Sequence, residues 1–256
     1  MTTSEPPFSI RHYESLDSTN EEARRLAKTG EQQKIWILTD EQTAGRGRRG
    51  RAWVSPKGNL MTTLYLPGPF APEIAGQLSF VAGLAIFDTV AKLIGDESLL
   101  GLKWPNDLLL SGAKLAGILL EASSSAERDI QSLAIGIGVN LRHHPLDTPY
   151  PASSLEKICE APTPIQALQI LAPCFDAHLA TWRAHGFLPI RNLWAQRAYG
   201  MGGDITARME THQVSGIFEG ITEDGNLLLR LTSGALETIA AGDIYFPHLM
   251  GMKNDK

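Results

Sequence analysis

Hydrophobic residues along this chain recur with two different periods, and each period predicts a different kind of element. One helical face, formed by Ala23, Leu26 and Ala27, begins after the capping residue Ser18 and stops at Gly30. The same spacing predicts further helices at residues 74–95, 164–185 and 188–199. Continuous apolar runs predict strands near residue 8 and at residues 35–39, 59–66, 99–104, 107–110, 115–121 and 133–141.

The order of these elements predicts the fold class. Turn residues separate the first three of the four runs between residues 99 and 141, which favours antiparallel neighbours, and Pro67-Gly68-Pro69 is expected to end the strand at 59–66. We therefore expect an α+β fold, with a mixed, largely antiparallel sheet and helices on one face, in residues 1–199. After Gly200 five short runs alternate with turns, which predicts a small β-barrel in residues 200–256 that docks on the first domain.

Composition places the chain among ordinary globular proteins. Its 256 residues are 43% hydrophobic, which is enough for a proper core, and its net charge of -5 argues against a surface that coats nucleic acid. Cys159 and Cys174 are the only cysteines and lack zinc-binding spacing. Residues 1–10 lack the apolar run of a signal peptide, and no apolar stretch reaches the roughly 20 residues that cross a bilayer. These features predict a reduced, cytoplasmic protein without structural metal.

A basic, glycine-rich heptad stands out against this acidic background. Residues 45–51 hold four of the chain's 23 Lys and Arg side chains, in the order Gly45-Arg46-Gly47-Arg48-Arg49-Gly50-Arg51. Glycines let the backbone approach a ligand closely, and arginines donate in a fork that suits phosphate or carboxylate. A solvated loop and a nucleic-acid tether are the alternatives. The acidic pI makes a local anionic ligand the better interpretation.

Lysines occupy two of the predicted strand ends that follow. Lys103 precedes the turn residues Pro105 and Asn106, and Asp107 comes directly after them. Lys114 opens a run that is otherwise apolar or glycine, so its ammonium group either reaches solvent or faces a buried anion, and we favour the anion. A strand-turn-strand arrangement would bring these charged side chains together, although a plain hairpin explains the turn equally simply.

A third segment places glycines at alternate positions of a strand. Gly136 and Gly138 leave one face of the strand at 133–141 without side chains, so a flat ligand could lie there. Close packing against a helix is the equal alternative. The segment is not a dinucleotide fingerprint, because the third glycine and the following helix are missing.

Taken together, these segments resemble the biotin–protein ligases. The resemblance rests on the heptad with Trp53 and Ser55-Pro56, on Lys103-Trp104-Pro105-Asn106-Asp107, on Lys114-Leu115-Ala116-Gly117-Ile118-Leu119, and on Gly136-Ile137-Gly138-Val139-Asn140. Ser18-Thr19-Asn20 resembles the polar motif that opens the family's first helix. The resemblance covers nearly the whole chain and implies a catalytic domain like those of class II synthetases, followed by an SH3-like barrel.

Membership of that family implies a two-step reaction. Biotin and ATP form biotinyl-5'-AMP and pyrophosphate, and a lysine of a biotin carboxyl carrier domain then takes the biotinyl group. Bringing a carboxylate onto a phosphate opposes two anions, so the resemblance implies Mg²⁺ and fixed positive charge, with Lys114 and Arg48 as the catalytic candidates.

The resemblance also assigns binding residues by motif. The biotin-binding positions are Ser18, Thr19, Asn20, Gln42, Arg46, Gly47, Arg48, Trp53, Lys114 and Gly117. The nucleotide-binding positions are Arg51, Trp104, Asn106, Asp107 and Asn140. Asp107 is the expected neighbour of Mg²⁺, because a hard anionic oxygen suits that ion. Two simpler alternatives stay open: Ser18 and Thr19 could serve only as helix caps, and Trp104 could belong to the core.

Two segments are expected to cover a reactive acyl-adenylate and keep water away. One is the heptad, where Arg51 is expected to order the loop and Arg49 has no assigned role. The other is the polar stretch at residues 142–153, which corresponds to a nucleotide-side loop in the family.

Two other functions compete with this interpretation. A lipoate or octanoate attachment enzyme shares the fold but lacks the Arg-rich heptad, and a noncatalytic RNA-binding module would use the basic loop and the barrel. The polar motif begins within 20 residues of Met1, which predicts a ligase-only type without a DNA-binding helix-turn-helix domain. The expected partner is a biotin carboxyl carrier protein, and a homodimer stays open.

Overall fold

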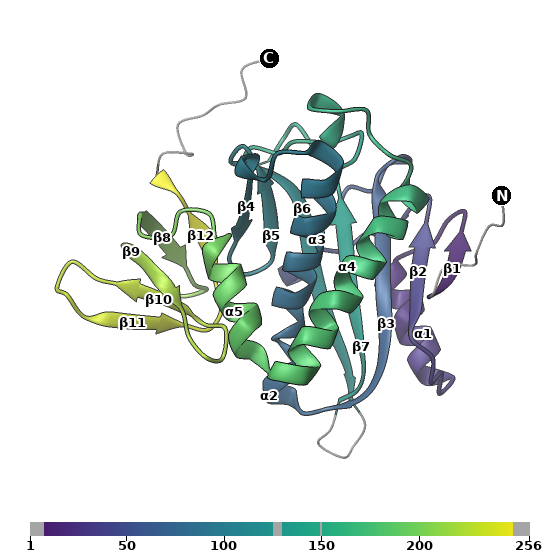
Figure 1. Ribbon diagram of the computed structural model, residues 1–256, viewed down its shortest axis with the longest axis horizontal. Coiled ribbons are helices and arrows are strands. Elements are labelled where there is room, and N and C mark those ends of the chain that lie inside the picture. Colours follow the sequence, from purple (N-terminus) through teal and green to yellow (C-terminus); the bar gives the residue numbers. More distant parts are fainter. Residues whose placement is uncertain (1–7, 125–129, 149, 248–256) are drawn as a thin grey trace.

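A seven-stranded sheet forms the centre of the molecule (Figure 1). The computed structural model describes residues 8–124, 130–148 and 150–247, so most of the segment examined for a signal peptide lies outside the described residues. In spatial order the strands are β1 (Ser9–Tyr13), β2 (Ile35–Thr39), β3 (Leu60–Phe70), β7 (Ile130–Val139), β6 (Ala113–Ser124), β5 (Asp107–Leu110) and β4 (Leu100–Lys103). β1 and β2 pair in parallel and the other neighbours pair antiparallel, which confirms the mixed, largely antiparallel sheet.

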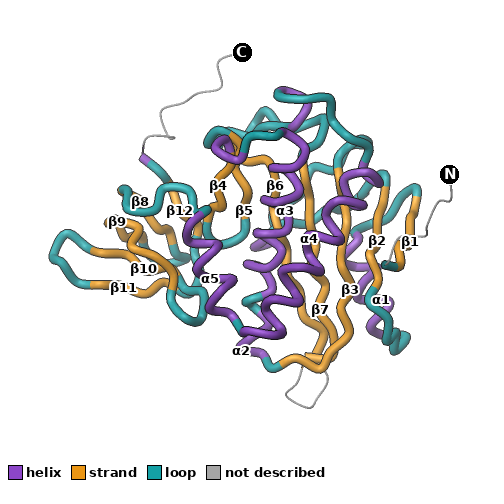
Figure 2. Tube along the Cα trace, viewed as in Figure 1, coloured by secondary structure: helices purple, strands orange, loops and turns teal. Residues whose placement is uncertain are grey.

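Three helices gather on one face of this sheet, as Figures 1 and 2 show. They are α3 (Leu78–Ile94), α4 (Pro164–His185) and α5 (Phe187–Gln196). α3 is apolar on most of its surface because it lies between the sheet and α4. No helix in the described part of the chain combines the length and the apolar character needed to cross a membrane.

The expectation that all helices share one face needs a correction. α1 (Thr19–Lys28) packs on the opposite face, where Ala23 and Leu26 join Ile35, Ile37 and Tyr65 in a separate small core. β2 therefore buries side chains on both faces, and all five of its residues are buried. The continuous apolar run of β2 is consistent with burial on both faces, but it does not show which element covers each face.

Several predicted boundaries were wrong, and the helix expected at residues 188–199 ends at Gln196 because the next three residues pair with β4. β3 does not end before Pro67 but continues to Phe70, because its pairing with β7 shifts register and resumes after the prolines. Gly68 permits this close approach, since a Cβ atom there would lie 2.5 Å from the carbonyl oxygen of Ile130. The single helix expected from residue 74 is two helices, α2 (Pro72–Ala75) and α3.

The C-terminal residues form a second, five-stranded antiparallel sheet. Its order is β11 (Leu236–Ile239), β10 (Leu227–Arg230), β9 (Gln213–Ile221), β8 (Asp204–Arg208) and β12 (Asp243–Tyr245). This confirms the five strands expected of the small C-terminal domain, whose core includes Phe218, Leu229 and Ile244. The boundary between residues 199 and 200 stays a prediction.

The connection between the two sheets is itself hydrogen-bonded to a strand. The amide of Leu102 on β4 donates to the carbonyl of Arg197 at 2.8 Å, and the amide of Tyr199 donates back to the carbonyl of Leu102 at 2.8 Å. Tyr199 then packs edge-on against Phe246 from the C-terminal sheet, with ring centroids 4.9 Å apart. The chain therefore enters its second sheet along an edge of the first.

Candidate active site

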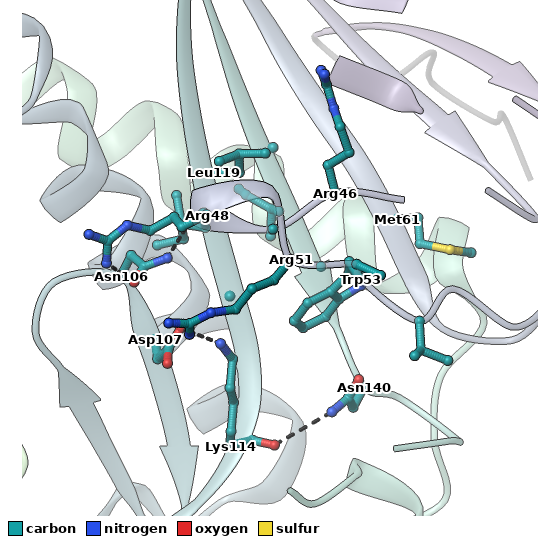
Figure 3. Close-up of a pocket in the computed structure, with 18 of the residues that line it drawn as sticks. Arg46, Arg48, Arg51, Trp53, Met61, Asn106, Asp107, Lys114, Leu119 and Asn140 are labelled. Atoms are coloured by element: carbon teal, nitrogen blue, oxygen red, sulfur yellow. Dashed lines mark hydrogen bonds and ion pairs between the residues drawn. The ribbon is translucent and has the colours of Figure 1, made fainter. Parts of the chain in front are cut away.

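A cavity of about 350 Å³ opens beside the heptad loop, over the middle of the large sheet (Figure 3). It collects almost every residue that the motifs indicated, from α1, β5, β6, β7 and the loops between them. The predicted residues that line it are Ser18, Thr19, Asn20, Gln42, Arg46, Gly47, Arg48, Arg51, Trp53, Asn106, Asp107, Lys114, Gly117 and Asn140.

Trp104 is the exception, because it is not among the residues that line the cavity. Its side chain is 2% exposed, and its indole Nε1 donates to the carbonyl of Gly225 in the C-terminal sheet at 3.0 Å. The structure therefore gives Trp104 a place in the core between the two sheets, in line with the simpler alternative, and not at a nucleotide site.

Neutral hydrogen bonds organise one end of the cavity. The backbone amide and the hydroxyl of Thr19 both donate to Gln42 Oε1, at 2.9 and 3.1 Å, and Gln42 Nε2 donates to the hydroxyl of Ser55 at 2.9 Å. The hydroxyl of Thr63 lies 2.6 Å from Asn20 Oδ1. Each side chain is held by its neighbours, so this end is rigid before any ligand binds.

The helix-cap alternative does not account for this arrangement. Ser18 occupies the N-cap position of α1, but its side chain makes no capping hydrogen bond. Ser18, Thr19 and Asn20 are polar, yet each is only 3–4% exposed. Buried polar side chains at the mouth of a cavity are suited to recognise a polar ligand.

The glycines of β7 make room for protein side chains, which at Gly136 matches the alternative of close packing against a helix. A Cβ atom at Gly136 would lie 2.3 Å from Asn20 Oδ1, and one at Gly138 would lie 2.5 Å from the ring of Trp53. A Cβ atom at Gly117 on β6 would lie 3.2 Å from the same ring. Gly136 thus leaves room for Asn20 of α1, and Gly117 and Gly138 leave room for Trp53. The ring of Trp53 therefore lines the cavity.

Charged side chains meet at the other end. Lys114 Nζ lies 2.7 Å from Asp107 Oδ1 and 5.6 Å from the centroid of the Trp53 ring. The strand pairing places Lys103 opposite Asp107, so the predicted meeting of these three charged residues is confirmed. Lys103 is 8% exposed, its Nζ lies 4.2 Å from the ring centroid of Tyr150, and burial lowers its pKa.

The arginines of the heptad point to different partners. Arg46 pairs with Glu21 at 2.6 Å and Glu121 at 3.2 Å, and Figure 3 shows it extending away from the charged end. Arg48 Nη1 donates to Asn106 Oδ1 at 3.1 Å, and burial lowers the pKa of Arg48. The loop is therefore attached to the body of the protein at several points.

Arg49 and Arg51 share one partner in the C-terminal sheet. Arg51 forms a hydrogen-bonded ion pair with Asp243, and Arg49 lies 3.5 Å from the same carboxylate. Arg49, which had no role in the sequence-based interpretation, thus has a defined neighbour. Asp243 also lines the cavity.

The second loop, predicted at residues 142–153, extends to Ser154, which precedes a short 3-10 turn, and two asparagines hold it. Asn140 Nδ2 donates to the carbonyl of Ser153 at 3.1 Å. Asn59 Oδ1 accepts from the amides of Arg142 and His143, both at 3.0 Å. Asn140 therefore holds the loop while it lines the cavity, and Asn59 is a positioning residue that the motif search missed.

No cluster of three or more His, Cys, Asp or Glu side chains that could hold a metal ion occurs among the described residues. Within the cavity, Asp107 is bound to Lys114 and Asp243 is bound to Arg51. The described donors do not form a protein cage for a metal.

Comparisons with known proteins agree with this geometry. A family model described as "Biotin/lipoate A/B protein ligase family" matches residues 13–140, and one described as "Biotin protein ligase C terminal domain" matches residues 202–246. The chain is 45% identical over 237 residues to a biotin–[acetyl-CoA-carboxylase] ligase of Paracoccus denitrificans, which covers 90% of this chain and 97% of that protein. The chain belongs to the biotin protein ligase family. The expected enzyme class, an ATP-dependent ligase, is confirmed.

More distant relatives of this ligase extend the comparison. A bifunctional ligase/repressor of Bacillus subtilis is 33% identical over 243 residues, 91% of this chain and 72% of that protein. A biotin protein ligase from Aquifex aeolicus, solved with biotin and ATP, is 24% identical, covers 93% of this chain and 97% of its own, and superposes with a TM-score of 0.78. The ligase from Leishmania major, solved with biotinyl-5-AMP, is 25% identical over 92% of this chain and 100% of its own, with a TM-score of 0.63.

Proposed function

We propose that the cavity makes biotinyl-5'-AMP and passes its biotinyl group to a lysine of a biotin carboxyl carrier domain. In the first step a carboxylate oxygen of biotin attacks the α-phosphorus of ATP, and pyrophosphate leaves. In the second step the lysine amine attacks the acyl carbon, AMP leaves, and the amine gives up a proton. The meeting of a neutral polar end and a cationic end in one cavity is the observation that carries this proposal.

The neutral end suits the ureido ring of biotin. That ring has two N–H donors and one carbonyl acceptor, and Thr19, Asn20 and Gln42 supply both kinds of partner in fixed positions. Between the two ends the cavity is lined by Trp53 and by the apolar side chains of Met61, Ile118, Leu119 and Ile137. These side chains suit the aliphatic chain that joins the ring to the carboxylate.

The charged end suits the reacting carboxylate and phosphates. Lys114 is held by Asp107 and lines the cavity from β6, so it can meet the α-phosphate and the biotin carboxylate together. Arg48 approaches from the heptad loop and is fixed by Asn106. Together they offset the repulsion between two anions.

Arg46 has a different proposed role from Arg48. Its guanidinium is engaged by Glu21 and Glu121, so we assign it to closing the biotin end of the loop. Gly47 and Gly117 contribute backbone at the cavity wall, and Gly117 also leaves room for the ring of Trp53. Arg51, Asn106, Asp107 and Asn140 are proposed for the nucleotide side.

Mg²⁺ fits this site when it arrives with the nucleotide. Mg²⁺ is commonly held by one or two carboxylates together with substrate phosphates, and Asp107 provides one carboxylate beside the proposed phosphate position. When bound, the ion would supply positive charge to the phosphates. Asp107 would orient Lys114 in the absence of the ion and contribute an oxygen in its presence.

The cellular setting is also part of the proposal. We infer a cytoplasmic enzyme because Cys159 and Cys174, the chain's 2 cysteines, are both free thiols. We also infer that the acceptor is the carrier domain of a biotin-dependent carboxylase, as the name of the Paracoccus relative suggests.

Substrate-dependent pyrophosphate release tests the proposal. Purified protein with ATP and Mg²⁺ is expected to release pyrophosphate with biotin, and mass spectrometry should detect biotinyl-5'-AMP bound to the protein. Lipoate and octanoate serve as matched substrates, because an attachment enzyme for either acid would share the fold. Release with lipoate or octanoate, and none with biotin, would contradict the assignment of the neutral end to a ureido ring.

A further inference from the structure

Strand β12 of the C-terminal sheet presents two side chains to the cavity loops. Side chains alternate along a strand, so Asp243 and Tyr245 share one face while Ile244 lies on the other. Ile244 is fully buried in the core of the small sheet, with 0% exposure. The strand is therefore anchored on one face and free to position other elements with the opposite face.

Asp243 reaches the heptad loop. It pairs with Arg51 and lies 3.5 Å from Arg49, although it stands 192 residues after Arg51 in the chain. The Asp243 side chain is 16% exposed, and that of Arg51 is 58% exposed. Burial alone would raise the pKa of Asp243, but the guanidinium groups of Arg51, Arg49 and Arg48 together outweigh burial and hold this pKa below its usual value.

The backbone of the heptad shows why the loop needs such an anchor. Arg49 adopts a left-handed conformation with φ 56° and ψ 36°, which a residue with a side chain seldom adopts and which costs of order 1 kcal/mol or more. An ion pair on the side chain of Arg49 opposes relaxation of that turn.

Tyr245 reaches the other loop. Its ring lies 4.9 Å from that of Tyr150, which belongs to the loop at residues 142–154 and lines the cavity. Arg208 of β8 covers Tyr245 at 4.8 Å, and Lys103 lies 4.2 Å from the ring of Tyr150. The two tyrosine rings are tilted by 48° to each other, and their contact, with the flanking cations, connects the second loop to the C-terminal sheet through Tyr245.

We propose that β12 positions both loops of the active site, with Asp243 holding the heptad and Tyr245 holding the loop at residues 142–154. Both are positioning residues: they act through Arg49, Arg51 and Tyr150, and neither is needed to touch the reacting atoms. The inference rests on the proposed location of the adenylate in this cavity. It gives the C-terminal sheet a defined task in catalysis.

Limited proteolysis tests the heptad anchor without depending on activity. Trypsin cleaves after arginine, and cleavage of a folded protein follows the population of the locally open loop. Asp243→Asn is expected to raise the rate of cleavage after Arg46, Arg48 and Arg49 about three- to tenfold, without a change in the thermal unfolding midpoint. Asp204→Asn, which removes an exposed carboxylate from the same sheet, should leave cleavage unchanged.

Activity measurements separate positioning from a purely structural role. Asp243→Asn should raise the KM for ATP several-fold more than it lowers kcat, and Asp243→Glu should restore part of the loss. If Asp243→Asn lowers the unfolding midpoint, Arg51→Gln tests the same contact from the loop side. Heptad cleavage equal to that of Asp204→Asn in both variants would overturn the anchor, whether or not the wild-type protein turns over biotin.

The second anchor has its own pair of variants. Tyr245→Ala should raise the rate of tryptic cleavage after Arg142 about three- to tenfold. Tyr245→Phe keeps the ring contact, so its cleavage rate should equal that of the wild type. Equal cleavage after Arg142 in Tyr245→Ala and Tyr245→Phe would overturn the assignment of Tyr245.

Discussion

The two ends of the cavity are built in different ways. At the neutral end, hydroxyl and amide groups of Thr19, Asn20, Gln42 and Thr63 hydrogen-bond to one another. The amide nitrogen of Asn20 also donates to the carboxylate of Glu121 at 2.7 Å. At the charged end, Lys114 is held through the opposite charge of Asp107. The first kind of contact fixes a shape, and the second keeps charge available for an anion.

The difference extends to where the partners lie in the chain. Thr19 and Gln42 are 23 positions apart, and Asn20 and Thr63 are 43 apart. Arg51 and Asp243, by contrast, are separated by 192 positions. The neutral end draws on α1, β3 and β6, since Asn20 Nδ2 also donates to Glu121 Oε2, 101 positions away, whereas the heptad loop draws on the C-terminal sheet. Substitutions at the two ends should consequently affect different substrates.

The largest effect is expected at Lys114. Lys114→Ala removes the ammonium group from the charged end and should slow biotin-dependent pyrophosphate release about 10²–10³-fold, comparable to the loss of an oxyanion donor. Release is measured at saturating biotin and ATP, with Lys28→Ala on the exposed side of α1 as the matched control. Nearly full release by Lys114→Ala would remove this residue from the proposed chemistry.

The next largest effect should follow from filling the space beneath Trp53. Gly138→Ala would place a Cβ atom 2.5 Å from the indole, so the ring must move into the cavity. Overpacking of this size costs about 1–3 kcal/mol, and we expect the KM for biotin to rise about ten- to hundredfold. Gly76→Ala is the control, because a Cβ atom there meets nothing within 4 Å. An unchanged KM would show that Trp53 does not border the bound biotin.

A smaller and more selective effect is expected at the neutral end. Gln42→Leu leaves the amide and hydroxyl of Thr19 without their acceptor, at a cost of about 1–3 kcal/mol. Biotin affinity, measured by isothermal titration calorimetry, should fall about tenfold while the KM for ATP stays constant. Gln33→Leu, at an exposed position, is the control. A comparable rise in the KM for ATP would contradict the separation of the two ends.

The smallest effect concerns Lys103, which lies behind the charged end. Burial lowers its pKa in the folded protein, so the unfolded chain holds more protons between the folded and unfolded pKa values, and the free energy of unfolding rises with pH in that window. Relative to Lys103→Met, the wild type should therefore gain stability as pH increases from neutral towards about 10.4, the unfolded value. Denaturant unfolding of both proteins across this range measures the change, and a difference independent of pH would argue against a buried ammonium group.

Much of the fold followed from local patterns. β2, β5 and α4 have the predicted boundaries, and five short strands were expected after Gly200. The errors have local physical causes: a register shift carries β3 past its prolines, and α1 covers a second face of the sheet. Periodicity describes one element at a time, so it does not show which face each neighbour covers.

The candidate site was predicted less evenly. Motif spacing collected residues that line one cavity, but it also included Trp104, which packs between the sheets. It missed Asp243, Tyr150 and Asn59, because their contacts join loops to distant segments and a single polar residue carries no periodic signal. Of the two interpretations of the alternating glycines, close packing against a helix holds at Gly136, which faces Asn20 of α1, whereas Gly138 makes room for Trp53 from another loop.

The short stretch from Arg197 to Tyr199 is hydrogen-bonded to Leu102, and this pairing limits where domains of two related proteins can be joined. Its backbone pairs with the edge strand β4 of the large sheet, so the small sheet follows the large one in a fixed register and not through a flexible linker. One extra residue there would shift the following chain by about 3.3 Å and exchange inward and outward side chains. Chimeras of two ligases should therefore keep this ribbon and its β4 partner from the same parent.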